Sequence, residues 1–162
     1  MRSRSVVAMG NFGDVVIEST NNGRNIATKC IAFHRSAQIC FKATHGFDWV
    51  VQANFYELNQ TLFEFAVAKV CSVFGVGVPI LTPYGFDLLC FRDHVEFSME
   101  LCQPLSEPVD SSIVTRLKHC MRVMHLLRIV HKDIKPANIL YCGSVGDYVL
   151  CDFGISHVVT VR

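Results

Sequence analysis

The chain has 162 residues, of which 51% are hydrophobic and 18% are charged. This length suits one domain, and the apolar content is too high for a disordered segment. The 15 Lys and Arg residues against 14 Asp and Glu residues leave a formal net charge of +1. No global field would therefore draw the chain to nucleic acid or to an anionic membrane, and we expect neither as a partner.

Eight cysteines are many for this length, but the two nearest, Cys142 and Cys151, are nine residues apart. This spacing excludes the Cys-x-x-Cys pairs of zinc and redox sites. Most of the cysteines have hydrophobic neighbours, where a free thiol behaves as a small core residue. We therefore expect reduced thiols and an intracellular, reducing compartment such as the cytoplasm or nucleus.

No segment reads as a signal peptide or a membrane span. The apolar run near the N-terminus, residues 6–9, is too short for a signal peptide. The most apolar stretch, residues 70–81, contains two glycines and a proline and is shorter than the roughly 20 residues that a span needs.

The first half of the chain is predicted to be strands around one helix. Apolar residues at three-to-four spacing predict a helix over residues 55–73. Short runs of β-branched and aromatic residues predict strands on both sides of it, with an Asn-Gly turn at Asn22-Gly23. These strands are expected at residues 5–9, 15–19, 25–33, 86–91 and 95–101.

A second helix is predicted over residues 111–129, after Pro104 and Pro108 and with Asp110 or Ser111 as its cap. Two strands should follow at residues 138–141 and 148–151, which gives an α+β fold rather than a βαβ repeat. The apolar stripe of the helix comprises Ile113, Leu117, Cys120, Met121, Met124 and Leu127. The charged side chains of the opposite face, which we interpret as a solvated surface, are Arg116, Lys118, His119 and Arg122.

The groups best suited to chemistry lie between His131 and Gly154. One loop offers the carboxylate of Asp133, the amine of Lys135 and the amide of Asn138, and a second carboxylate, Asp152, comes nineteen residues after the first. Phosphoryl transfer to a hydroxyl uses these groups, because a carboxylate accepts the proton, an amine neutralises the phosphoryl group, and amide and carboxylate oxygens bind Mg²⁺. No His/Cys cluster competes for the metal.

The run His-Lys-Asp-Ile-Lys-Pro-Ala-Asn and the later Asp-Phe-Gly resemble the catalytic loop and metal-binding motif of eukaryotic protein kinases. The resemblance implies a single kinase-like domain with an antiparallel β nucleotide lobe at about 1–102 and a partial, helical lower lobe at about 103–162. It implies ATP and Mg²⁺ as cofactors, Asp133 and Lys135 as catalytic residues, and Asn138 and Asp152 as metal ligands. His131 would steady the loop.

Two positions bear on the subtype. Lys135 followed by Pro136 resembles Ser/Thr kinases and argues against tyrosine kinases and small-molecule phosphotransferases. Lys132 stands where the family has an arginine that grips a phosphorylated activation loop, so we do not expect that mode of regulation.

The N-terminal strands carry a segment similar to the glycine-rich kinase loop, G-x-G-x-x-G-x-V, with Ala8 in place of the first glycine. Lys29 lies in a segment similar to the V-A-I-K strand, and would pair with the ATP phosphates and with a helix glutamate; Lys42 is a less well placed rival. The implied nucleotide-binding residues of the loop are Val7, Ala8, Gly10, Asn11, Phe12, Gly13 and Val15.

The glutamate partner of Lys29 is expected to be Glu64, with Glu57 as the alternative, and residues 31–51 look like an insertion. Further on, residues 97–102 resemble the strand that leads into the kinase hinge. Met99 would lie behind the adenine, and the backbone of Glu100 and Cys102 would hydrogen-bond its edge.

Only eight residues follow Asp-Phe-Gly, whereas the family continues into further large helices. We therefore expect a truncated domain, of a kind that would suit a virus in a host cell, with the stripe of the 111–129 helix uncovered and open to a partner. The main hypothesis is a Ser/Thr protein kinase that acts on a protein. The alternatives are an inactive kinase-like module that docks on a partner kinase or its substrate, and a small-molecule phosphotransferase.

Overall fold

The computed structural model describes residues 4–10, 13–20, 23–32, 47–81, 89–90, 94–106 and 108–160. The chain divides into two compact units. The first unit comprises residues 1–63 and 82–98, and the second comprises residues 64–81 and 99–162. Neither described helix is both long and apolar enough to cross a membrane.

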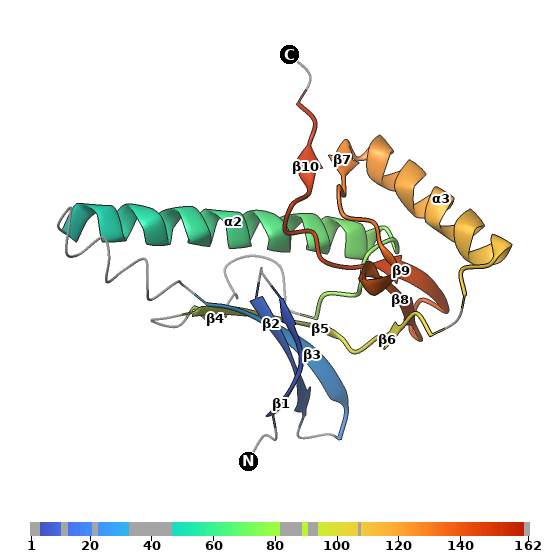
Figure 1. Cartoon of the computed structure of the whole chain (residues 1–162), viewed down its shortest axis with the longest axis horizontal. Coiled ribbons are helices and arrows are strands. Elements are labelled where there is room, and N and C mark those ends of the chain that lie inside the picture. The colour runs from blue at the N-terminus through green and yellow to red at the C-terminus, as the bar shows by residue number, and fades with distance from the viewer. Residues whose placement is uncertain are drawn as a thin grey trace. The chain divides into compact units, whose positions relative to one another are not determined.

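The first unit contains an antiparallel hairpin sheet, visible at the lower centre of Figure 1. The sheet has the strand order β1-β2-β3-β5-β4. Before β3, where the sequence predicts a turn, Gly23 adopts φ 77° and its N–H bonds to the carbonyl of Thr20, while Asn22 lies outside the described residues. The strands are β1 (Arg4–Gly10), β2 (Gly13–Ser19), β3 (Asn25–Ala32), β4 (Leu89–Cys90) and β5 (His94–Glu100).

Helix α2 (Phe47–Val73) begins eight residues before its predicted start and ends as predicted. Apolar residues are too dense in residues 47–54 to show a helical period, so the pattern gave no signal there. After α2, Gly75 adopts φ 66°, which favours glycine, and its N–H bonds to the carbonyl of Ser72. The predicted insertion falls mostly outside the described residues.

The second unit is built around a three-stranded sheet in the order β6-β8-β9. Its strands are β6 (Gln103–Pro104), β8 (Ile139–Cys142) and β9 (Asp147–Leu150). The chain after α2 extends this sheet, because Gly77 pairs with Leu150 in parallel. Two backbone hydrogen bonds, from Val78 to Leu150 at 3.0 Å and from Leu150 to Val76 at 2.9 Å, hold this segment on β9.

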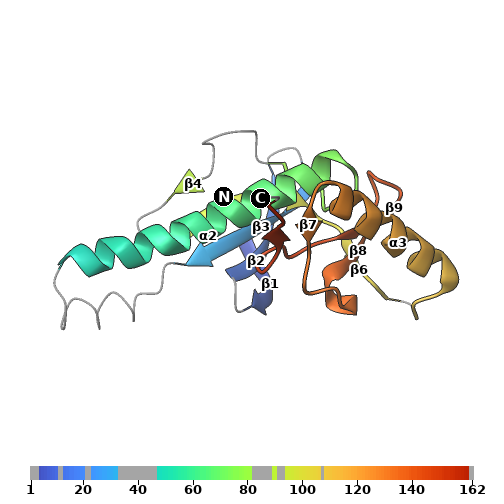
Figure 2. The same ribbon diagram turned by 90° about the horizontal axis from the view of Figure 1, so that it is seen from above.

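Helix α3 (Ser111–Leu126) lies beside the β8–β9 hairpin, as Figures 1 and 2 show. Its N-cap is Asp110, whose carboxylate accepts hydrogen bonds from the N–H groups of Ser112 and Ile113, both at 2.9 Å. The helix ends three residues earlier than predicted, because Arg128 turns the chain at φ 59°.

Very short elements complete the unit and were not predicted. Strand β7 (Ile129–Val130) pairs antiparallel with β10 (His157–Val158), and η1 (Pro136–Asn138) is a single 3₁₀ turn. Elements of two or three residues are too short to show a period, and the β7–β10 pair joins segments far apart in the sequence.

The expectation that the α3 stripe is uncovered is wrong for its centre. Ile113, Cys120 and Met124 are buried, and Cys120 has no exposed surface. The helix packs on β7 and β9, and the end of α2 approaches it, since Cys71 and Cys120 are close enough to interact electrostatically. The short strands and the end of α2 therefore cover the centre of the stripe.

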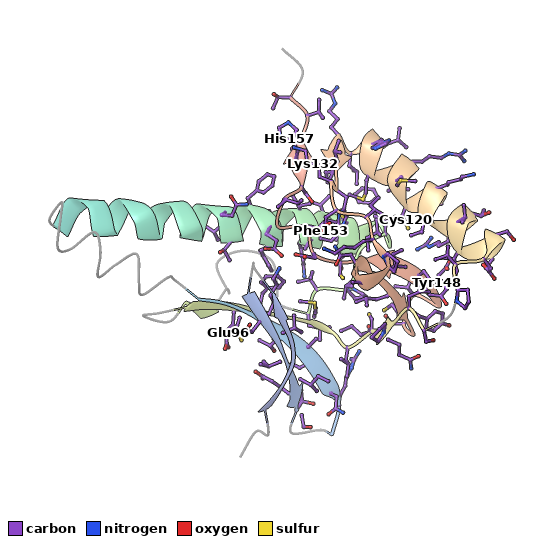
Figure 3. The ribbon with its side chains drawn as sticks, viewed as in Figure 1. Glu96, Cys120, Lys132, Tyr148, Phe153 and His157 are labelled. Carbon is purple, nitrogen blue, oxygen red and sulfur yellow. The ribbon has the colours of Figure 1, made fainter. Side chains whose placement is uncertain are left out.

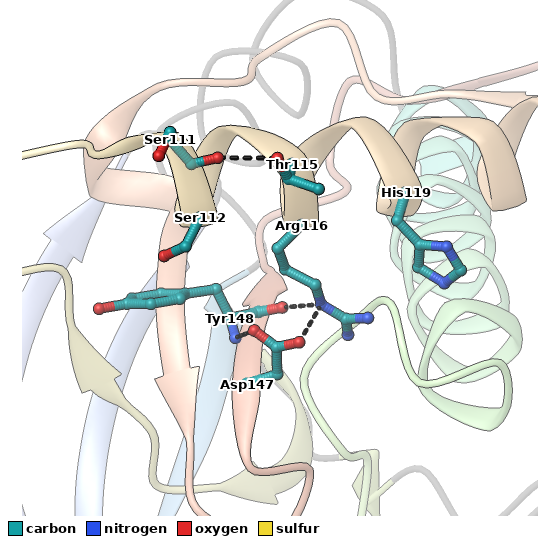
Figure 4. Close-up of a pocket in the computed structure, with 7 residues that line it drawn as sticks. All are labelled: Ser111, Ser112, Thr115, Arg116, His119, Asp147 and Tyr148. Carbon is teal, nitrogen blue, oxygen red and sulfur yellow. Dashed lines mark hydrogen bonds and ion pairs between the residues drawn. The ribbon is translucent and has the colours of Figure 1, made fainter.

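The interpretation of Arg116 as part of a solvated face is also wrong. Its Nε donates to the carbonyl of Tyr148 at 2.9 Å and lies 3.1 Å from a carboxylate oxygen of Asp147 (Figure 4). Its Nη2 donates to the carbonyl of Gly75 at 2.6 Å. One guanidinium thus joins α3 to β9 and to the turn after α2. The pattern of polar and apolar residues within a helix carries no information about such distant partners, so the sequence did not predict these contacts.

Candidate functional site

The catalytic-loop motif lies between β7 and η1, and backbone geometry shapes it. Lys132 adopts φ 69°, an unusual value for a residue other than glycine. Lys135 is then extended, and Pro136 begins η1, where the fixed φ of proline suits the first turn. The sharp bend at Lys132 and the turn at η1 fold the loop back, so that its polar side chains converge.

Three of the predicted site residues meet in this loop. The Nζ of Lys135 donates to Oδ2 of Asp133 at 2.7 Å, and Nδ2 of Asn138 donates to the same oxygen at 3.0 Å. Nδ2 of Asn138 also donates to the backbone carbonyl of Asp133 at 2.8 Å. One carboxylate is thus held in place by an amine and an amide.

The two charges of the loop stabilise one another. The Lys135 hydrogen bond is the main cause that lowers the pKa of Asp133, and the same bond raises the pKa of Lys135. At neutral pH the site therefore contains a carboxylate and an ammonium group side by side. The carboxylate is available as a proton acceptor, and the ammonium group as a counter-charge for an anion.

His131 connects this loop to the segment that carries Asp152. Its Nε2 bonds to the carbonyl of Cys151 at 3.0 Å, and its Nδ1 accepts the N–H of Asp133 at 3.3 Å. This pattern requires the neutral imidazole with the proton on Nε2, and burial, the main cause, lowers the pKa of His131. The ring also packs against Phe153, labelled in Figure 3, with centroids 4.9 Å apart.

Asp152 follows directly on β9 and adopts φ 63°, a left-handed conformation that Asp tolerates better than most residues. The N–H of Cys151 donates to the carbonyl of Asn138 at 3.1 Å, which ties the two predicted metal-binding segments together. The charge of Asp152 contributes to the raised pKa of Lys135, and it partly opposes the burial that lowers the pKa of His131. Asp152 thus lies near the loop, although nineteen residues separate it from Asp133.

The chemistry of Asn138 and Asp152 fits a magnesium ion. Because Nδ2 of Asn138 is committed to Asp133, the atom of its amide that remains for an external ligand is Oδ1. A carboxylate and an amide oxygen form the donor set that a hard cation prefers. No group of three or more His, Cys, Asp or Glu residues is arranged for a metal within the part of the chain that the structure describes.

The glycine-rich segment forms the connection between β1 and β2 in the first unit. Gly10 lies opposite Gly13 at the end of the hairpin, and a register shift after Val6 leaves Val7 without a partner before Ala8 pairs with Val15. Asn11 and Phe12 lie outside the described residues. The facing ends of β1 and β2 therefore carry one glycine each, and a glycine lets the backbone approach a ligand closely.

Lys29 lies on β3 directly opposite Val15 of β2, and its side chain is buried. The structure thus brings the predicted phosphate lysine next to the strand that leaves the glycine-rich segment. Glu64 is buried in α2, in the second unit, and Glu57 lies in the same helix. The choice between Glu64 and Glu57 as partner of Lys29 stays a prediction.

The predicted hinge begins where the two units divide, after Ser98. Met99 forms a bridge with Ile80, and the N–H of Glu100 donates to the carbonyl of Pro79 at 2.9 Å. Cys102 is buried. The N–H of Glu100 is therefore used within the protein, and the carbonyl of Glu100 and the N–H of Cys102 are the backbone groups that we assign to a ligand.

A shallow pocket of about 610 Å³ lies between α3 and β9, and Figure 4 shows its lining. None of the predicted site residues belongs to it. Its polar walls come from the start of α3 and from Asp147 and Tyr148, and Arg116 is already bonded to both. A further interaction that the sequence did not predict joins the carboxylate of Glu100 to the hydroxyl and the N–H of Ser144.

Comparison with known proteins bears on these features. The family described as "Protein kinase domain" matches residues 90–162, a range that contains the hinge segment, the catalytic loop and Asp-Phe-Gly. Residues 90–162 are therefore similar to the protein kinase domain. The predicted family and the α+β kinase-like fold class are thereby confirmed.

Individual protein kinases also match parts of the chain. The chain is 31% identical over 75 residues to a non-specific serine/threonine protein kinase of Drosophila melanogaster, covering 41% of this chain and 11% of that protein. It is 40% identical over 57 residues to mitogen-activated protein kinase kinase 10 of Arabidopsis thaliana, covering 35% and 18%. It is 36% identical over 58 residues to mitogen-activated protein kinase kinase 5 of Leishmania mexicana, covering 35% and 11%. The chain thus spans less than a fifth of each of these relatives.

Proposed function

We propose that this protein transfers the γ-phosphoryl group of ATP to a Ser or Thr hydroxyl of a protein. The observation that carries the proposal is the convergence of Lys135 and Asn138 on one carboxylate oxygen of Asp133, at 2.7 and 3.0 Å. In this arrangement the Asp133 carboxylate orients the attacking hydroxyl and accepts its proton. Lys135 then offsets the charge of the transferring phosphoryl group.

The cofactors of this reaction are ATP and Mg²⁺, as is typical of the family. Asn138 and Asp152 would bind the metal through oxygen atoms, and the metal would neutralise the phosphates. The glycine-rich hairpin and Lys29 would bind the phosphates, and the hinge backbone at Glu100 and Cys102 would bind the adenine. Residues of about 1–102 would then serve as the nucleotide lobe and residues of about 103–162 as the partial lower lobe.

A protein substrate is favoured by the relatives. Those with the longest matches are named as serine/threonine protein kinases and mitogen-activated protein kinase kinases, so the partner we propose is a protein, which can itself be a kinase. The Lys135-Pro136 pair, which separates Ser/Thr protein kinases from small-molecule phosphotransferases in the sequence, is exposed beside Asp133. Because Lys135 is exposed, a hydroxyl carried by a large protein substrate can approach it.

The test is transfer of radiolabelled phosphate from ATP to a generic basic protein, with Asp133→Asn as the paired variant. Loss of a general base lowers kcat by about 10² to 10⁴, so the variant should transfer almost no label. Label transferred equally by both proteins would come from a contaminant and would contradict the proposal. Absence of transfer from both would favour the docking module instead.

A further inference from the structure

A network of four side chains joins the predicted hinge to the β8–β9 hairpin. The antiparallel register of β6 and β8, carried past the ends of these strands, places Cys102 opposite Cys142. Carried two residues further, it places Glu100 opposite Ser144. We call these four residues, all in the second unit, the strand clamp.

The strongest contact of the strand clamp is between Glu100 and Ser144. The Ser144 hydroxyl donates to one carboxylate oxygen of Glu100 at 2.5 Å, and the Ser144 N–H donates to the other at 3.3 Å. A carboxylate bound through both oxygens by one residue is fixed in direction as well as in position. The segment around Glu100 is therefore held on the β8–β9 turn.

The two cysteines extend this contact into the core. Because the single proton of the Ser144 hydroxyl is given to Glu100, the thiol of Cys142, 3.4 Å away, acts as the donor to Ser144. Burial is the main cause that raises the pKa of Cys102, and a hydrogen bond with Cys142 raises it further. Cys102 and Cys142 also belong to one buried apolar cluster with Val78.

The strand clamp thus encloses the backbone that we assign to the adenine. The carbonyl of Glu100 and the N–H of Cys102 lie between two side-chain anchors, and the N–H of Glu100 is bonded to Pro79. A ligand that binds backbone groups gains affinity when those groups are already fixed, because no ordering cost remains on binding.

We infer that Ser144 is a positioning residue for nucleotide binding, acting through the carboxylate of Glu100 on the hinge backbone. This inference rests on the proposed function, since it concerns the affinity of the same proposed site for the nucleotide. It concerns a residue of the β8–β9 turn that is exposed and that carries no part of the kinase motifs.

The test measures the Kd of Mg-ATP by calorimetry for the wild type, Ser144→Ala and Ser144→Thr. Loss of the hydroxyl should weaken binding about threefold to tenfold, and threonine, which keeps the hydroxyl, should restore it. KM for ATP should rise by the same factor as Kd. The matched control is Ser106→Ala, which removes an exposed hydroxyl outside the strand clamp and should bind as the wild type does.

A double variant tests whether Ser144 acts on nucleotide affinity through Glu100. Glu100→Ala should weaken binding at least as much as Ser144→Ala, and combining the two should weaken it no further, because both break the same contact. Additive losses would overturn the inference, as would a Ser144→Ala protein with the wild-type Kd. A wild-type protein that binds no nucleotide would instead contradict the proposed function, and the inference with it.

Discussion

The Nδ1 atom of His131 accepts the backbone N–H of Asp133 at 3.3 Å, while Nε2 of the same ring bonds to Cys151. A buried neutral imidazole therefore holds the proposed catalytic carboxylate and the metal-binding segment together. Protonation would place a hydrogen on Nδ1 and remove its ability to accept the Asp133 N–H. The folded state should resist that protonation.

This resistance predicts a pH-dependent stability. The pKa of His131 is lowered from its ordinary value of 6.5, so the folded state binds fewer protons than the unfolded state in mildly acidic solution. The contribution of neutral His131 to the stability of the folded state is fully present above pH 6.5 and is lost as the pH falls through the lowered pKa. The Tm, followed by circular dichroism between pH 7.5 and about 5, should decline less steeply in His131→Gln than in the wild type. The exposed His119→Gln variant is the control, and an unchanged slope in His131→Gln would refute the assignment.

Lys135 should influence both the rate and its pH dependence. In Lys135→Met the phosphoryl group loses its counter-charge, and the pKa of Asp133 rises because its main cause of depression is removed. We expect kcat to fall by about 10²-fold or more, and the acid limb of the pH–rate profile to move to higher pH. Lys132→Met, which changes an exposed lysine three residues earlier, should keep the acid limb in place. If kcat falls but the acid limb does not move, Lys135 does not control the pKa of Asp133 in the active enzyme, and that part of the prediction is wrong.

Gly77 should tolerate no side chain. A Cβ at this position would lie 2.8 Å from Cβ of Cys71 and 3.2 Å from its backbone carbon. Overpacking of this kind costs about 1–3 kcal/mol, so Gly77→Ala should lower the free energy of unfolding measured in urea by that amount. Gly143→Ala, where a Cβ meets nothing within 4 Å, is the matched control. Equal unfolding midpoints for the two variants would show that the close approach is absent.

Arg116 should be structural despite its charge. Arg116→Ala removes two hydrogen bonds to carbonyls and a contact with Asp147, and should lower the free energy of unfolding by about 2 kcal/mol. Arg116→Lys should recover only part of this, because an ammonium group cannot reproduce the planar fork. Arg122→Ala, on the exposed surface of α3, should change stability little. Full recovery by lysine would mean that charge alone matters there.

The sequence predicted best the features that are local. The β1–β3 strands, both helices and the β8–β9 hairpin each have a period or a turn signal within a short window, and all are present. The convergence of Asp133, Lys135 and Asn138 was also predictable, because these residues share one loop with a specific motif.

The features that the sequence did not predict depend on contacts between distant segments. The pairing of Gly77 with Leu150, the β7–β10 bridge and the three bonds of Arg116 join residues that lie 27 or more positions apart. No window of sequence contains both partners of such a contact. The cover of the α3 stripe was misjudged for the same reason, since β7, β9 and the end of α2 supply it from separate parts of the chain.

The buried cysteines of the second unit have a practical consequence. Cys71, Cys102, Cys120 and Cys142 are almost entirely inaccessible, and burial raises the pKa of Cys71 to about 12. Alkylating reagents attack the thiolate and must reach it, so these sulfur atoms should react slowly while the unit is folded. Their rate of modification by iodoacetamide, followed by mass spectrometry, would therefore report how often the core of the second unit opens, with no residue substituted.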